Sequence, residues 1–115
     1  MLKDDLIRVN HMLAAAREAI GFARGHTRAS LEGNRLLTLA LLKAIEIIGE
    51  AAAHVGDDTQ AKYSAIPWAA VIGMRNRLIH TYFNINLDLV WDTVTRDLPP
   101  LITELEKIPL PEPRK

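Results

Sequence analysis

Near the start of the chain, apolar side chains recur at alternating steps of four and three positions. This spacing collects them on one side of an α-helix, because a helical turn takes 3.6 residues. The stripe consists of Leu2, Leu6, Val9, Leu13, Ala16, Ile20 and Ala23. We therefore expect an amphipathic helix from about Lys3 to Ala23 that packs one side against the rest of the chain.

A second helix is expected from about Ser30 to Val55, after the polar connection 24–28. Its apolar residues surround much of the helix, which predicts a central position in a bundle. Its polar residues Glu46, Glu50 and His54 are spaced four apart and share one face. A catalytic or metal-binding carboxylate cluster is one interpretation, but a polar edge facing solvent or an interface is favoured. We expect Gly56 to cap the helix in a left-handed conformation.

Two further helices are predicted in the second half of the chain. One begins near Pro67, after the polar stretch 57–60, since proline suits a first helical position. It continues through Ile79 and loses its pattern around residues 83–86. The other begins after Asn86, a good N-cap, with Asp88 in its first turn. A kink or break is expected at 99–100, where two prolines are adjacent, and a frayed proline-rich tail at 109–115.

The composition agrees with a single all-α domain. The chain has 115 residues, of which 49% are hydrophobic and 5% aromatic, and this balance favours interdigitating helices. It has no cysteine, which excludes disulfides and thiolate chemistry. Acidic Asp4 and Asp5 stand where a signal peptide would be apolar, and no apolar run of about 18 residues follows. We expect a cytoplasmic protein that does not enter the membrane.

The charges of the chain cancel, with 14 basic and 14 acidic residues. A net-neutral molecule does not attract a polyanion over long range, so any contact with RNA must be local. The nearest approach to a basic patch is Arg24, His26 and Arg28, with Arg35 following. Ordinary solvated loop charge is the favoured interpretation of this patch.

The segment from Gly73 to Phe83 combines several chemically active side chains near a predicted helix end. On an ideal helix Asn76 and His80 share a face, whereas Arg75 and His80 lie about 140° apart. The reach of arginine, a distorted helix end, or a two-fold axis between two copies could bring the latter two together. A dimer is the simplest of these explanations, and Gly73 would suit tight packing or such an interface.

These residue types suit RNA cleavage without a metal ion. A 2′-hydroxyl that attacks the adjacent phosphate needs a group that transfers a proton near neutral pH, and His80 is such a group. It also needs a fixed cation on the phosphate, which Arg75 supplies. Asn76 could orient the histidine or the phosphate, and Arg77 could contact the substrate backbone. From the residues alone, helix capping or surface ion pairing is the more common role for such a pair.

The surrounding sequence resembles the HepT-like branch of the HEPN superfamily over about residues 3 to 107. Its Arg-x4-His-x-Tyr motif matches Arg75, His80 and Tyr82. The remaining likeness lies in Glu46-Ile47-Ile48-Gly49-Glu50-Ala51-Ala52, Ile66-Pro67-Trp68, Gly73-Met74-Arg75-Asn76, His80-Thr81-Tyr82-Phe83, Val90-Trp91 and Asp97-Leu98-Pro99. The resemblance implies a HEPN domain over residues 1–108, with 109–115 as a flexible tail.

The resemblance further implies an all-α, up-and-down bundle of four to five helices that forms a homodimer, with the two motifs facing a shared cleft. Arg75 and His80 would be the catalytic pair of a metal-independent endoribonuclease toxin that needs no cofactor. The implied partner is a minimal nucleotidyltransferase antitoxin that adenylylates Tyr82, and a larger assembly of the two proteins is left open. The nucleotidyltransferase's own Gly-Ser and Asp-x-Asp signature is absent from the chain.

Two other functions stay open at this point. The chain could be a non-catalytic helical module that binds the nucleotidyltransferase, because HEPN proteins include such partners. It could also be a purely structural helical dimer. No metal site is predicted, because the four histidines are scattered and only His54 has carboxylates at helical spacing.

Overall fold

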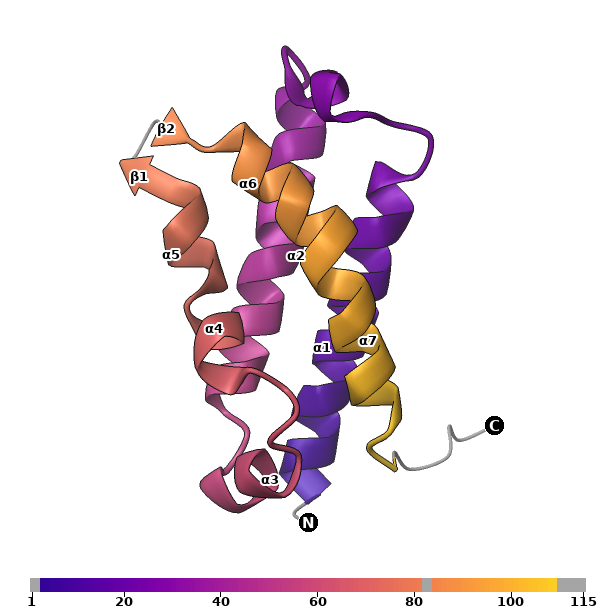
Figure 1. The fold of residues 1–115 in the computed structure, drawn as a ribbon, viewed down its shortest axis with the longest axis vertical. Helices are drawn as coiled ribbons and strands as arrows, with labels where there is room; N and C mark the ends of the chain where they lie inside the picture. Colours follow the sequence, from indigo (N-terminus) through magenta and orange to yellow (C-terminus); the bar gives the residue numbers. More distant parts are fainter. Residues whose placement is uncertain (1–2, 82–83, 110–115) are drawn as a thin grey trace.

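The computed structural model describes residues 3–81 and 84–109, and most of them are helical. The elements in chain order are α1 (Lys3–Ala23), η1 (Arg28–Leu31), α2 (Arg35–Ala53), α3 (Asp57–Lys62), α4 (Trp68–Ile72), α5 (Met74–Leu78), β1 (Ile79–Thr81), β2 (Asn84–Ile85), α6 (Leu87–Asp92), η2 (Thr93–Asp97) and α7 (Leu98–Glu106). Figure 1 shows α1, α2, α4–α5 and α6–α7 running alternately up and down. The predicted all-α, up-and-down arrangement is confirmed, but the described residues form more helices than the four to five expected, because the second half of the chain is divided into short helices.

The first helix follows its predicted pattern. It spans Lys3–Ala23, and the described members of its apolar stripe are buried or packed against the core. Its long partner is α2, which packs against α1, α4, α5 and α6. The predicted central position of α2 is therefore confirmed, and the core lies between these helices.

The second helix is shorter than predicted at its start. Residues 28–31 form the short helix η1, and Gly33 has a φ of +73°, a left-handed conformation that suits glycine. Asn34 then caps α2, because its side-chain oxygen accepts a hydrogen bond from the Leu37 backbone N–H at 3.0 Å. On α2 itself, Leu36 and Leu39 remain exposed although the helix is central.

Gly56 is not the left-handed cap of α2, which was a wrong prediction. Its φ of −65° places it at the N-cap of α3, and α3 occupies the stretch predicted as a polar connection. The reason is Asp5, which accepts hydrogen bonds from the Gly56 N–H at 3.0 Å and from the Thr59 hydroxyl. A side chain on Gly56 would bring its Cβ to 3.3 Å from Asp5 Oδ2. Asp5 thus joins the starts of α1 and α3.

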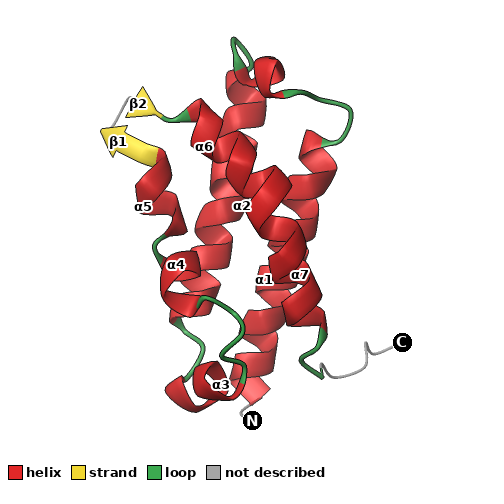
Figure 2. Ribbon diagram, in the orientation of Figure 1, coloured by secondary structure: helices red, strands yellow, loops and turns green. Residues whose placement is uncertain are grey.

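The helix predicted from Pro67 through Ile79 towards residues 83–86 is interrupted and ends early. Pro67 is the N-cap of α4, Gly73 separates α4 from α5, and α5 ends at Leu78. Ile79 is extended, and the Leu78 carbonyl accepts a 2.7 Å hydrogen bond from the Asn86 N–H instead of continuing the helix. Strand β1 pairs antiparallel with β2, the small hairpin coloured yellow in Figure 2. These strands were not predicted.

The last helical segment begins as predicted and is continuous across its prolines. Asn86 accepts a hydrogen bond from the Leu89 N–H at 3.1 Å. A π-helical stretch, η2, precedes the prolines at 99–100, so the expected interruption is a change of hydrogen-bond pattern. Prolines lack an N–H, and the wider π turns redistribute the bonds of the carbonyls before them. Within the described ranges, no helix has the length and apolarity needed to cross a membrane. Of the tail predicted at 109–115, residues 110–115 lie outside the described residues.

Candidate active site

A groove lies between α2 and the paired short helices α4 and α5, with a volume of about 350 Å³. Both of its walls carry polar groups. The residues that line it are Glu46, Gly49, Glu50, Ala53, Ile72, Arg75 and Asn76. It therefore joins two features that are separate in the sequence: the polar face of α2 and the start of the Arg-x4-His segment.

Close backbone packing at Gly49 forms the floor of this groove. Gly49 is buried in α2, and a Cβ there would lie 3.2 Å from the Ile72 carbonyl oxygen and 3.3 Å from that of Val71. These distances are shorter than usual Cβ contacts, so the absence of a side chain lets α4 approach α2. The glycine predicted for tight packing was Gly73, but a Cβ there would have only an ordinary 3.4 Å contact with the Ala69 carbonyl.

Arg75 lies across the groove from the carboxylate of Glu46. Its Nε is 3.9 Å from Glu46 Oε2, and Lys43 Nζ is 3.6 Å from Glu46 Oε1. The Arg75 side chain is 49% exposed and the Glu46 side chain 34%. Because the Arg75–Glu46 contact is long and open to water, it orients the guanidinium only weakly. The guanidinium of Arg75 stays accessible to an anion that enters the groove.

The predicted polar face of α2 continues from the Arg75 groove into a neighbouring groove. Glu50 and His54 line it with Arg8 and His11 from α1, and His54 Nδ1 is bonded to the Glu50 carbonyl at 2.8 Å. Among the described residues, no group of three or more histidine, aspartate or glutamate side chains could hold a metal ion. Glu46 and Glu50 of this face thus line the Arg75 groove, and the face extends to His54 in the neighbouring groove.

Asn76 and Arg77 lie on different sides of α5. Asn76 is exposed and lines the Arg75 groove. Arg77 lines a separate groove of about 290 Å³ between α4–α5 and η2–α7, where its Nη2 donates to the Ala70 carbonyl at 3.3 Å. The structure therefore brings Arg75 and Asn76 together and separates Arg77 from them.

His80 lies in strand β1 and not on a helix. The helical geometry predicted for it, with Asn76 on the same face and Arg75 about 140° away, is therefore wrong because α5 ends at Leu78. Its side chain lies outside the described part of the structure, as do the whole of Tyr82 and Phe83. The backbone places His80 in the hairpin that directly follows the α5 wall of the groove.

Sequence reasoning did not pair Glu46 with Arg75. The two residues are far apart along the chain, and their approach depends on how α2 packs against α5. The available signal was Gly49, a glycine inside an otherwise apolar helix, which indicates a close backbone approach.

Comparison with known proteins agrees with this architecture. The family model described as "Ribonuclease HepT-like" matches residues 12–108. The chain belongs to the HepT-like family. The match to this family includes α2, the Arg75 groove and the β1–β2 hairpin, and so confirms the resemblance noted in the sequence.

Several curated relatives of this HepT-like chain carry ribonuclease names. "Putative RNase MJ1380" of Methanocaldococcus jannaschii is 35% identical over 83% of this chain and 87% of its own length. "Putative RNase TTE0752" of Caldanaerobacter subterraneus subsp. tengcongensis is 31% identical over 87% of this chain and 89% of its own length. "Probable ribonuclease HepT" of Thermococcus cleftensis is 39% identical over 60% of this chain and 63% of its own length. No solved structure gives a significant match.

Proposed function

We propose that this chain is an endoribonuclease that cleaves RNA without a divalent metal ion, with Arg75 and His80 as its catalytic residues. The observation that carries the proposal is the position of Arg75. Its half-exposed side chain lines a groove, on the helix that leads directly into the strand bearing His80, in a chain of the HepT-like family. The ribonuclease names of the curated relatives support the same activity.

The proposed reaction is a transesterification within the RNA chain. His80 accepts the proton of a 2′-hydroxyl, whose oxygen attacks the adjacent phosphorus and forms a 2′,3′-cyclic phosphate. The bond from phosphorus to the 5′-oxygen breaks, and that oxygen takes a proton from an imidazolium. Arg75 stabilises the negative charge on the phosphate oxygens, and Asn76 positions the phosphate from the same groove wall.

We propose that the active form is a homodimer. Leu36 is 82% exposed, Leu39 43% and Ile72 39%, and Ile72 also lines the Arg75 groove. Apolar side chains this open to water favour burial against another surface. Pairing of two copies through the outer face of α2 would bring their grooves close together. One histidine could then accept the proton while the other donates it.

The cellular role that fits this activity is that of a toxin controlled by a nucleotidyltransferase antitoxin. Adenylylation of Tyr82, two residues after His80, would place a negative phosphate and a nucleoside beside the catalytic residues. Both charge repulsion and steric obstruction would then exclude RNA. Incubation of the chain with such a nucleotidyltransferase and ATP should add an adenylyl group detectable by mass spectrometry. The Tyr82→Phe variant should stay unmodified at that position and remain active.

Controlled expression of the chain alone in bacteria tests the toxin role. The unmodified chain should arrest growth and produce new RNA fragments, whereas an Arg75→Ala/His80→Ala variant at equal soluble level should do neither. Normal growth and intact RNA with both proteins would contradict the toxin role. If the purified chain then also formed a stable complex with the nucleotidyltransferase, a non-catalytic partner module would be favoured instead.

A further inference from the structure

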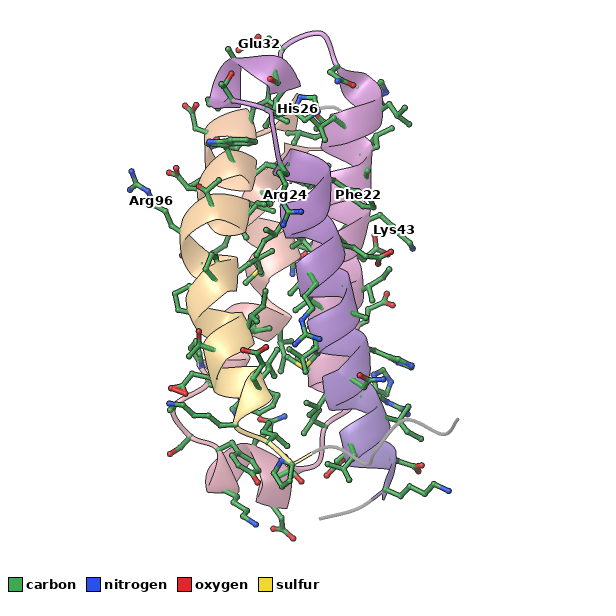
Figure 3. The ribbon with its side chains drawn as sticks, turned by 90° about the vertical axis from the view of Figure 1, so that its right-hand side faces the viewer. Phe22, Arg24, His26, Glu32, Lys43 and Arg96 are labelled. Atoms are coloured by element: carbon green, nitrogen blue, oxygen red, sulfur yellow. The ribbon has the colours of Figure 1, made fainter. Side chains whose placement is uncertain are left out.

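A further groove lies between the end of α1 and the α6–η2–α7 segment, with a volume of about 310 Å³. Its lining is partly apolar, with two basic side chains and one large aromatic ring. The lining residues are Ile20, Ala23, Arg24, His26, Trp91, Val94, Thr95 and Pro99. Figure 3 faces this side of the molecule, with Arg24 and His26 near the end of α1 and in the connection after it. None of these residues lines the Arg75 groove.

The structure divides the basic patch seen in the sequence into two parts. The guanidinium of Arg28 is occupied by contacts within the protein, because it forms ion pairs with Asp88 and Glu32 and so joins η1 to α6. Arg24 and His26 have no ion pair among the described residues. No acidic side chain is among the residues that line this groove. The groove is therefore locally positive in a chain whose total charge is zero.

Trp91 gives this positive groove a fixed aromatic surface. The residue is partly buried and packs against the hydrophobic core, so its indole keeps little rotational freedom. The hydroxyl of Thr95 donates to the Trp91 carbonyl at 2.8 Å, which satisfies that hydroxyl within the helix. The wall on this side thus offers mainly apolar and aromatic surface to a ligand.

We propose that this groove holds a single-stranded segment of RNA away from the catalytic groove. A base stacks against Trp91, and a neighbouring phosphate binds Arg24, with His26 as a second donor. Cations beside an aromatic ring, without competing carboxylates, suit single-stranded nucleic acid, since any base can stack and every nucleotide carries a phosphate. The inference rests on the proposed ribonuclease function, and it supplies the local contact that a net-neutral chain needs to retain RNA.

Binding of a labelled 12-nucleotide RNA with 2′-O-methyl riboses, followed by fluorescence anisotropy, tests this site. The 2′-oxygen of this probe cannot attack phosphorus, so binding is measured without cleavage. Arg24→Ala should weaken binding by about threefold to tenfold and lower the slope of log Kd against log salt by about 0.7. Lys62→Ala removes one positive charge from α3, at the opposite end of the bundle, and should change neither quantity (Figure 1).

Tryptophan fluorescence tests the stacking contact separately. Addition of the same RNA should quench the unmodified chain, whereas the Trp91→Phe variant should not be quenched. The tryptophan left in that variant, Trp68, is buried and donates its indole N–H to the Tyr63 carbonyl at 3.1 Å. Quenching that persists in Trp91→Phe, or equal weakening by Arg24→Ala and Lys62→Ala, would overturn the inference.

The two proposals fail in different ways. If unmodified RNA is cleaved but Arg24→Ala leaves both probe affinity and KM unchanged, this groove is not an RNA site and the ribonuclease proposal stands. If the probe binds through Arg24 and Trp91 but no RNA is cleaved, the binding site stands and the ribonuclease proposal fails.

Discussion

At the scale of single residues, Asp5 makes the clearest stabilising contacts that the sequence pattern did not reveal, with Gly56 and Thr59. It is buried, and its carboxylate receives hydrogen bonds from the Thr59 hydroxyl and the Gly56 N–H, which hold its pKa below the ordinary value. These donors lie 54 and 51 positions away in the chain. By contrast, the N-cap at Asn86 was predictable, because its side chain accepts a hydrogen bond from the backbone N–H of Leu89, only three positions away.

Replacement of Asp5 by asparagine should destabilise the protein at neutral pH by about 1–3 kcal/mol, because the bonds to a charged acceptor are lost. Because the pKa of Asp5 is lower in the folded state than its unfolded-state value of 3.8, ionised Asp5 stabilises the fold fully at pH values above 3.8. This stability is lost as the pH falls through the folded-state pKa. The difference in unfolding free energy between Asp5→Asn and the unmodified chain should therefore shrink below about pH 4. Urea unfolding across pH 2–7 measures it.

The neighbouring Asp4 provides the control for this experiment. Asp4 also lies in the first turn of α1 but is exposed. Asp4→Asn should cost well under about 1 kcal/mol, since an exposed charge near a helix dipole contributes little. Equal losses in the two variants, or a pH-independent loss in Asp5→Asn, would mean that the charge of Asp5 is not what stabilises the junction of α1 and α3.

At the scale of elements, the fit of α2 against α4 depends on Gly49. Alanine at an ordinary helix position stabilises by about 1 kcal/mol relative to glycine. At Gly49 the added Cβ meets backbone carbonyls at 3.2 and 3.3 Å, and backbone does not move aside easily. We expect Gly49→Ala to destabilise by about 1–2 kcal/mol, within the range for overpacked sites, and to shift α4–α5 and thereby Arg75. Thermal unfolding checks the first effect and RNA cleavage the second.

Gly21→Ala is the matched control, because a Cβ at Gly21 has no atom within 4 Å. It lies in α1, is exposed, and should raise stability by up to about 1 kcal/mol. If Gly49→Ala proved as stabilising as Gly21→Ala, the close approach of α4 would not depend on glycine.

The elements also show where sequence patterns are sufficient. The helix α1 and its end at Ala23 were predictable, because one apolar stripe with regular spacing specifies a helix by local information. The end of α5 at Leu78 was not predictable from local spacing. It depends on a hydrogen bond that the Leu78 carbonyl accepts from the Asn86 N–H, which belongs to a later segment of the chain. Around the candidate site, the sequence proposed Arg75 and Asn76 as candidates but did not predict that they line one groove with Glu46.

At the scale of the whole molecule, the proposed dimer should be disrupted by a charge placed on the exposed apolar side of α2. Leu39→Arg places a charge on the exposed apolar side of α2 and should shift the protein from dimer to monomer with the fold preserved. Sedimentation velocity measures the mass, and circular dichroism the helical content. Thr103→Arg adds the same charge at an exposed position of α7 and should remain dimeric. A dimer that persists in Leu39→Arg would place the interface elsewhere.

Arg75 and His80 are proposed to cleave RNA without a metal ion. Incubation of the purified chain with RNA in excess EDTA, followed by analysis of the product ends, tests this mechanism. We predict fragments ending in 2′,3′-cyclic phosphate, and a loss of at least about 100-fold in rate for Arg75→Ala and for His80→Ala, with helical content unchanged. Cleavage that stops in EDTA, or continues at the same rate in both variants, would contradict the account.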